Sequence, residues 1–143
     1  MTAGISSSDT RVQVSIDEFV ATVTINRPEK LNAIDPEMLI ALRSAFEALD
    51  RASNVRVIVL TAAGDRAFSV GADVNAWAAL EPIDMWRRWV RDGHATLDVI
   101  ASVRQPASRR STGWRLEEDW KWRWPATCGL LRNQRGSDHP RSG

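Results

Sequence analysis

The strongest chemical signal in the chain lies at residues 67–73, which read Ala-Phe-Ser-Val-Gly-Ala-Asp. Small residues let the backbone approach a ligand closely, and free N–H groups where a helix begins form an anion site. Such donors suit the oxyanion that develops when a thioester carbonyl is attacked or enolised. The same turn also serves an ordinary strand-to-helix connection that Asp73 caps. The residues leave both interpretations open.

Other residues with chemical potential give weaker signals. His94 has no cysteine or second histidine at ligand spacing, so we expect no metal. Cys128 is the single cysteine, which excludes an internal disulfide and fits a reducing, cytoplasmic location. Residues 117–119 are all acidic but lie in a segment without periodicity, so a paired-carboxylate site is not expected there.

The elements that must position residues 67–73 can be read from the apolar pattern. Residues 12–16 and 19–26 alternate as half-buried strands, and the short link between them predicts a hairpin. Asp35 followed by Pro36 is a helix start, and Leu39, Leu42, Phe46 and Leu49 form one apolar stripe after it.

Two further elements complete the predicted unit. Residues 55–63 are β-branched and apolar, which is typical of a strand covered on both faces. Residues 85–103 predict a helix that Gly93 weakens, with Trp86, Trp89, Val90, Leu97 and Ile100 as its apolar face. Strands, a helix and a buried strand in this order predict an α/β fold with a crossover connection.

The composition changes abruptly at residue 106 of the 143-residue chain. Residues 1–106 carry 11 basic and 14 acidic side chains, whereas residues 107–143 carry 8 and 4 and hold four of the seven tryptophans. The apolar residues of the second piece follow neither the strand nor the helix period. We therefore expect a flexible N-terminus at 1–10 without features of a secretory signal, a partial domain at 11–106, and a disordered tail at 107–143.

Three stretches of the first piece together resemble one family. Residues 20–34 read Val-Ala-Thr-Val-Thr-Ile-Asn-Arg-Pro-Glu-Lys-Leu-Asn-Ala-Ile, and residues 55–61 read Val-Arg-Val-Ile-Val-Leu-Thr. With residues 67–74, in this order and at this spacing, they resemble the opening of the crotonase family, which contains enoyl-CoA hydratases and isomerases. Residues 102–106, Ser-Val-Arg-Gln-Pro, resemble the lead-in to its next strand. The resemblance covers residues 11–106 and implies the N-terminal portion of a ββα spiral fold.

The resemblance also implies a function in acyl-CoA (fatty-acid) metabolism, with an acyl-CoA thioester as substrate and no separate cofactor. The backbone N–H of Ala72 matches one of two oxyanion-hole donors, which makes Ala72 the catalytic candidate. The coenzyme A contacts implied in the same way are Lys30, Leu31, Ala33, Ser69, Gly71, Ala72 and Asp73. The family forms trimers or pairs of trimers.

After residue 106 the family pattern stops, and the genetic code offers a reason. The family continues with a Gly-Gly-Gly-Leu-Glu-like turn that supplies the second oxyanion donor and one of two catalytic glutamates, and residues 107–143 contain neither. Asp119-Trp120-Lys121 must be encoded by GA(C/T)-TGG-AA(A/G), which reads Leu-Glu one frame over. Synonymous codons before it can encode Gly-Gly-Gly. We therefore expect a crotonase-like protein frameshifted near residues 106–108, truncated relative to its family and inactive as this chain.

Two alternatives remain from other functional classes. Residues 109–135 interleave basic and aromatic side chains, which could track phosphates and stack bases or lie at a membrane surface. GC-rich codons read out of frame give the same composition, so neither a nucleic-acid nor a membrane partner is expected. The first piece could instead be a structural partner of intact paralogues.

Overall fold

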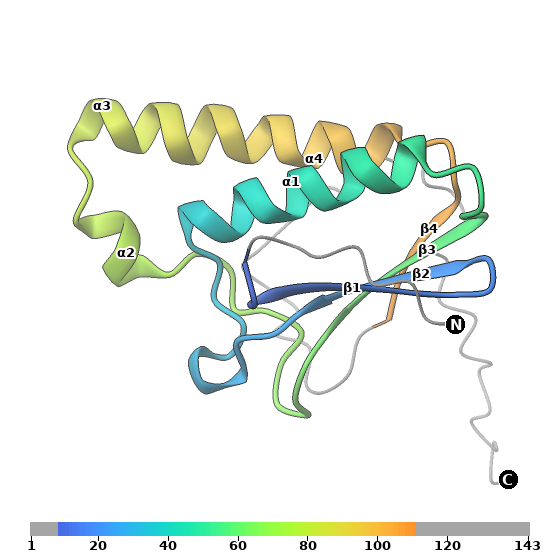
Figure 1. The fold of residues 1–143 in the computed structure, drawn as a ribbon. Coiled ribbons are helices and arrows are strands. Elements are labelled where there is room, and N and C mark those ends of the chain that lie inside the picture. Colours follow the sequence, from blue (N-terminus) through green and yellow to red (C-terminus); the bar gives the residue numbers. More distant parts are fainter. Residues whose placement is uncertain (1–8, 111–143) are drawn as a thin grey trace, which may run out of the picture.

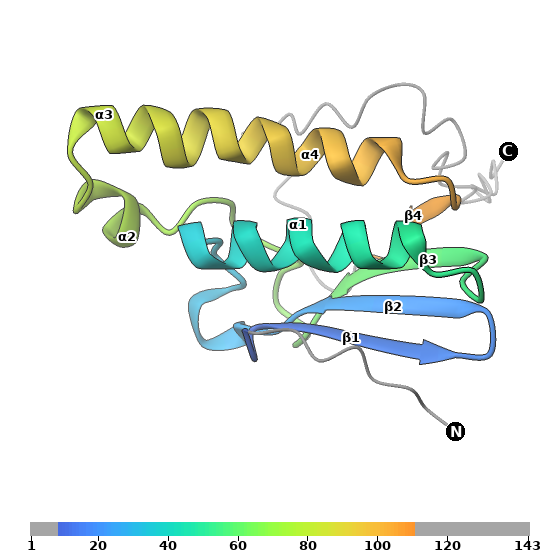
Figure 2. The ribbon, with the colours of Figure 1, turned by 45° about the horizontal axis from the view of Figure 1, so that its top comes forward.

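A computed structural model describes residues 9–110, which form a four-stranded sheet with helices on one face (Figures 1 and 2). The strands are β1 (Val12–Asp17), β2 (Val20–Ile25), β3 (Val57–Ala62) and β4 (Ala107–Arg109), and they lie in the sheet in chain order. The helices are α1 (Pro36–Arg51), α2 (Val74–Ala78), α3 (Pro82–Asp84) and α4 (Asp92–Ser102). No helix within residues 9–110 has the length and apolarity needed to span a bilayer.

The first two strands form the predicted hairpin. They pair antiparallel with Val12 opposite Ile25 and Asp17 opposite Val20, and Glu18 turns the chain with a φ of 51°. Alternate residues of β2 are buried, which confirms the predicted orientation of its two sides.

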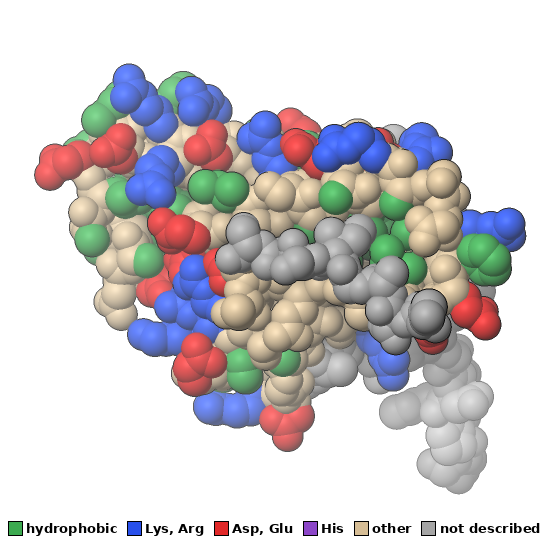
Figure 3. Space-filling model, viewed as in Figure 1, with side chains coloured by type: hydrophobic (Ala, Val, Ile, Leu, Met, Phe, Trp, Pro, Cys, Tyr) green, Lys and Arg blue, Asp and Glu red, His purple; other side chains and the backbone are tan. Residues whose placement is uncertain are grey.

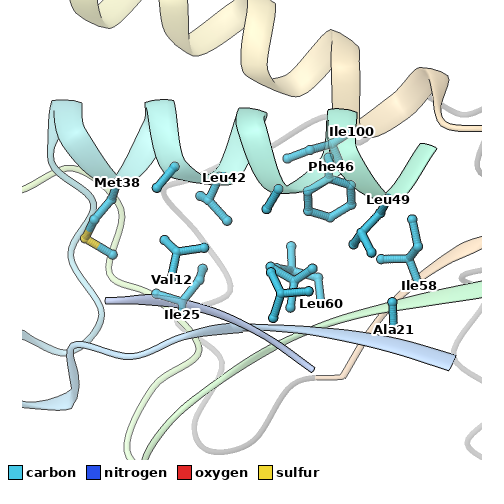
Figure 4. Close-up of a cluster of buried hydrophobic side chains, with 14 of the residues drawn as sticks. Val12, Ala21, Ile25, Met38, Leu42, Phe46, Leu49, Ile58, Leu60 and Ile100 are labelled. Carbon is cyan, nitrogen blue, oxygen red and sulfur yellow. The ribbon is translucent and has the colours of Figure 1, made fainter. Parts of the chain in front are cut away.

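Helix α1 begins and packs as the sequence predicts. The Asp35 side chain accepts a hydrogen bond from the N–H of Met38 at 2.9 Å, which caps the first turn, and Pro36 occupies the first helical position. The predicted stripe of Leu39, Leu42, Phe46 and Leu49 is buried. It packs against the side chains that the sheet directs upward, among them Val12, Ile25, Ile58 and Leu60 (Figure 4).

Strand β3 pairs parallel with β2, so α1 is the crossover connection between them. The sequence predicts that β3 is covered on both faces, and the structure buries one face more deeply than the other. Ile58, Leu60 and Ala62 are buried under the helices, whereas Val57, Val59 and Thr61 are only half-buried. Within residues 9–110 the helices lie on one face of the sheet, which explains the difference (Figure 2).

The predicted helix at residues 85–103 is longer and less regular than its sequence indicates. It starts at Pro82 and passes through a π-helical stretch, Met85–Arg91, before it continues as α4. Wider π turns rotate side chains away from the α-helical period. For this reason Trp86 and Val90, predicted to be on the apolar face, are exposed, whereas Ile100 is buried.

The sheet also continues past the expected boundary at residue 106. Ala107–Arg109 form β4, which pairs parallel with β3, and the N–H of Arg110 donates to the Leu60 carbonyl at 2.9 Å. Residues 107–109 therefore belong to the sheet, although the sequence analysis assigns them to the disordered tail. Strand pairing uses backbone groups, so three residues of almost any type can add to an open edge. Residues 111–143 of the expected tail lie outside the described residues.

Candidate functional site

Two loops meet at the ends of the parallel strands β2 and β3. Residues 26–35 follow β2 and residues 63–73 follow β3, and parallel strands end at the same edge of a sheet. An isolated bridge joins the loops: the N–H of Ile34 donates to the Gly71 carbonyl at 2.7 Å, and the N–H of Asp73 donates to the Ile34 carbonyl at 2.8 Å. Ala72 is thereby held opposite Ile34.

Asn32 ties the two loops together with its side-chain amide. Its Oδ1 accepts from the N–H of Arg27 at 2.9 Å, and its Nδ2 donates to the carbonyls of Ala63 and Ala67, each at 2.9 Å. Asn32 is 1% exposed and has a φ of 56°, a left-handed conformation that asparagine tolerates better than most residues. The sequence places Asn32 within the Lys-Leu-Asn-Ala stretch, but we did not identify it as a site residue.

Ser69 and Gly71 shape the second loop. The Ser69 hydroxyl donates to the Asn32 carbonyl at 2.7 Å and accepts from the N–H of Gly71 at 3.1 Å. Gly71 is buried and has a φ of 94°, which side chains rarely allow. These polar groups are therefore used inside the protein to fix the loop rather than left free for a ligand.

A group of charged side chains surrounds the residues that flank the Ile34–Ala72 bridge. Arg27 Nη1 is 2.9 Å from Asp73 Oδ2 and 3.5 Å from Asp35 Oδ2, and it donates to the Ala33 carbonyl at 3.1 Å. Arg11 forms a second ion pair with Asp35. Lys, Arg, Asp and Glu side chains gather over the loop between β2 and α1 (Figure 3).

Burial acts to raise the pKa of Asp73, but hydrogen bonds from the N–H of Ala76 and from Arg27 outweigh it. The pKa of Asp73 therefore lies below its ordinary value, and the carboxylate is charged at neutral pH. The same carboxylate caps α2 by accepting from the N–H groups of Asn75 and Ala76 at 3.2 and 3.4 Å. The predicted cap is confirmed, and it occupies the N–H groups at the helix start that the sequence offered as an anion site.

At the bridge, the backbone N–H of Ala72 has no acceptor among residues 9–110. The N–H of Val70 donates to the Leu31 carbonyl at 3.2 Å, and those of Gly71 and Asp73 are used as described above. The N–H of Ala72 makes no such bond to the described part of the chain. Ala72 is half-buried, and within the described part of the chain its N–H is unpaired beside the bridge.

The remaining predicted contacts lie in the first loop. Lys30 is exposed at the end of a 3-10 turn, Pro28–Lys30, and Leu31 is half-buried with a φ of 51°. Ala33 is buried, so it can offer a ligand no more than its place in the backbone. The structure thus brings the predicted residues of both loops to one edge of the sheet, and it adds Arg27, Asn32 and Asp35, which the sequence did not mark as site residues.

Metal binding finds no support in the described part. Within residues 9–110, no three His, Cys, Asp or Glu side chains are close enough together to hold an ion. Trp77 is used in packing, because its indole N–H donates to the Ile34 carbonyl at 3.0 Å and its ring lies 4.3 Å from that of Trp89.

Comparisons with known proteins give a consistent result. Residues 15–103 match the family model described as enoyl-CoA hydratase/isomerase. The probable enoyl-CoA hydratase EchA14 of Mycobacterium tuberculosis is 31% identical over 139 residues, which cover 92% of this chain and 54% of that protein. The (E)-benzylidenesuccinyl-CoA hydratase of Thauera aromatica is 34% identical over 87 residues, which cover 60% of this chain and 33% of that protein.

Solved structures agree with these sequence matches. An enoyl-CoA hydratase/carnithine racemase from Magnetospirillum magneticum superposes with a TM-score of 0.69 at 29% identity, over 74% of this chain and 40% of that one. The chain spans about half the length, or less, of the proteins that it resembles.

Proposed function

This chain belongs to the enoyl-CoA hydratase/isomerase family, with a partial crotonase fold, and on that premise we propose that its two loops form part of an acyl-CoA thioester site. In this proposal the N–H of Ala72 donates to the thioester carbonyl. The observation that carries it is a contrast at the bridge: Val70, Gly71 and Asp73 use their N–H groups internally, whereas that of Ala72 has no acceptor among residues 9–110.

The chemistry of the family explains why such a donor matters. Attack on an enoyl thioester, or its enolisation, moves negative charge onto the carbonyl oxygen. A fixed N–H aimed at that oxygen stabilises the charge without reorganising, and removing one donor of this kind costs on the order of 10²–10³ in rate. The bridge to Ile34 fixes the backbone on both sides of Ala72 and so supplies the required rigidity.

The coenzyme A moiety is the second part of the proposal. Lys30 is an exposed cation in the same loop as Ala33, and an ammonium group binds phosphate oxygens as a mobile point charge. We propose that residues 30–33 run beside the pantetheine and nucleotide of the ligand. The same proposal includes hydration or isomerisation of an enoyl-CoA thioester by the whole enzyme, the trimeric or hexameric assembly of the family, and a cytoplasmic location.

We further propose that this chain does not hydrate crotonyl-CoA faster than background. The family's second oxyanion donor and its two catalytic glutamates have no counterpart in the 143 residues. One donor can polarise a carbonyl, but it cannot deliver a water and a proton. Turnover at about 1 per second or faster by a preparation free of host hydratase would contradict this proposal.

The proposed origin of this gap is a frameshift near residues 106–108. The match to EchA14 covers more of the chain than residues 1–106 contain, so it extends into the segment that we propose to be out of frame. The gene sequence decides whether the segment after residue 106 is out of frame. Restoring one base near codon 107 should open a frame that encodes Gly-Gly-Gly-Leu-Glu and then Pro-Glu about twenty codons later; an early stop would contradict the frameshift.

Binding tests the site itself. Isothermal titration should show that the purified chain binds crotonyl-CoA, with a Kd at or below about 1 mM. Infrared spectra with a ¹³C-labelled carbonyl should show the thioester stretch moving to lower frequency on binding. Replacing Ala72 by lactic acid, which exchanges only its N–H for oxygen, should abolish that shift, and the same exchange at Ala79 is the control. A wild-type chain that binds neither crotonyl-CoA nor coenzyme A would overturn the proposed function.

A further inference from the structure

We propose that Arg27 is a positioning residue for the oxyanion donor: its ion pair with Asp73 fixes the bridge that presents the N–H of Ala72, an inference that rests on the proposed function. Arg27 does not itself reach the reacting carbonyl in this account. Arg27 acts on the N–H of Ala72 through Asp73, the residue that follows Ala72 in the chain.

The contacts of one nitrogen atom support this role. Arg27 Nη1 is within 3.5 Å of acceptors from three residues in the two loops: the Ala33 carbonyl, Asp35 Oδ2 at the start of α1, and Asp73 Oδ2 at the start of α2. Ala33 and Asp35 flank Ile34, and Asp73 follows Ala72. Both sides of the Ile34–Ala72 bridge are therefore anchored to the same guanidinium group.

The two acidic partners depend on Arg27 to different degrees. Asp35 also pairs with Arg11, so it keeps a cation when Arg27 is removed. Asp73 has no other cationic partner among residues 9–110. Its side chain is 9% exposed, and a buried carboxylate that loses its cation is strongly disfavoured. Loss of Arg27 is thus felt mainly at Asp73 and at the bridge rather than at α1.

The same pair has an electrostatic consequence for the donor. The Asp73 carboxylate belongs to the residue next to Ala72, and an uncompensated negative charge there would oppose an oxyanion. Arg27 neutralises that charge at 2.9 Å. It therefore keeps the surroundings of the N–H favourable to the developing negative charge as well as holding the backbone in place.

Amide hydrogen exchange of the ligand-free chain tests the positioning directly. In Arg27→Met, the N–H groups of Ile34 and Asp73 should exchange at least about tenfold faster than in the wild type. The N–H groups of Leu39 and of the β1–β2 hairpin should keep their rates, because Arg11 still holds Asp35. Arg27→Lys should restore part of the protection. Arg43→Met is the matched control, since it removes an exposed arginine whose one ion pair within residues 9–110 is with Glu47 on α1.

Unchanged exchange at Ile34 and Asp73 in Arg27→Met would overturn the inference whether or not the chain binds a thioester. Equal acceleration throughout the sheet would also overturn it, because it would make Arg27 an ordinary stability residue. If Arg27→Met does not fold, Asp73→Asn decides the matter. It keeps an acceptor for the α2 cap but removes the charge, so the Ile34 N–H should again lose protection selectively.

The thioester spectrum then separates this inference from the proposed function. At saturating crotonyl-CoA, Arg27→Met should lose most of the carbonyl shift that the bound thioester shows in the wild type. A full shift in this variant would overturn the positioning role. Failure of the wild type to bind any coenzyme A compound would overturn the proposed function, while the exchange experiment would still judge the role of Arg27 in the bridge.

Discussion

Replacing Asn32 should destabilise the chain more than any single surface substitution. Asn32→Ala removes three hydrogen bonds from a side chain that is 1% exposed, and it strands the N–H of Arg27 and the carbonyls of Ala63 and Ala67. At about 1 kcal/mol for each bond, this loss amounts to about 3 kcal/mol. Alanine at a φ of 56° costs about 1 kcal/mol more.

Asn32→Gly is the matched variant, because it loses the same hydrogen bonds but accepts the left-handed backbone. We expect a loss of about 4 kcal/mol in the free energy of unfolding for Asn32→Ala and about 3 kcal/mol for Asn32→Gly. Urea denaturation followed by circular dichroism measures both, provided the slopes stay equal. A loss below about 1 kcal/mol for Asn32→Ala would contradict the claim that the hydrogen bonds of Asn32 hold the two loops together. Equal losses for the two variants would contradict the claimed cost of the left-handed backbone for alanine.

Three further results are expected from the described contacts. Gly93→Ala should stabilise the chain by about 0.5–1 kcal/mol in thermal denaturation, because a new Cβ would lie in ordinary contact, 3.9 Å from Leu39 Cδ1; a loss would contradict the helical environment. The contribution of Asp73 should be fully present above about pH 4, the ordinary range of a carboxyl group, and should disappear as the pH falls through its lowered folded pKa. The stability gap between the wild type and Asp73→Asn, measured by urea titration, should therefore close in acid, and a gap independent of pH would contradict the lowered pKa. Trp77→Phe should cost about 1 kcal/mol by thermal denaturation, because it leaves the Ile34 carbonyl without the indole donor, and an unchanged melting temperature would argue against that bond.

Local rules account for much of what the sequence predicts correctly. The cap at Asp35, the stripe at Leu39, Leu42, Phe46 and Leu49, and the hairpin each depend on residues that are neighbours along the chain. The loop at residues 67–73 could be found for the same reason, since its small residues and terminal aspartate lie within seven positions.

The parts that the sequence did not predict depend on contacts between distant segments. Arg27 and Asp73 meet across the junction, and Asn32 reaches carbonyls more than thirty positions away. Periodicity carries no information about such pairs. The exposed Trp86 has a different cause, because the π-helical stretch changes the period on which the helical pattern was read.

The order of the strands has a consequence for how the chain can fold while it is being synthesised. Each strand of the sheet lies beside the one synthesised just before it, so the sheet can grow at a single edge as residues emerge. The hairpin needs nothing downstream, β3 can add once the crossover helix α1 is complete, and the Ile34–Ala72 bridge can close before α4 has been made. At a synthesis rate of about 5–20 residues per second, each addition has on the order of seconds, far longer than a hairpin or a helix takes to form. Synthesis from the N-terminus therefore favours assembly of the two loops before α4, the helix that packs against α1, and an altered order of strands would remove this advantage.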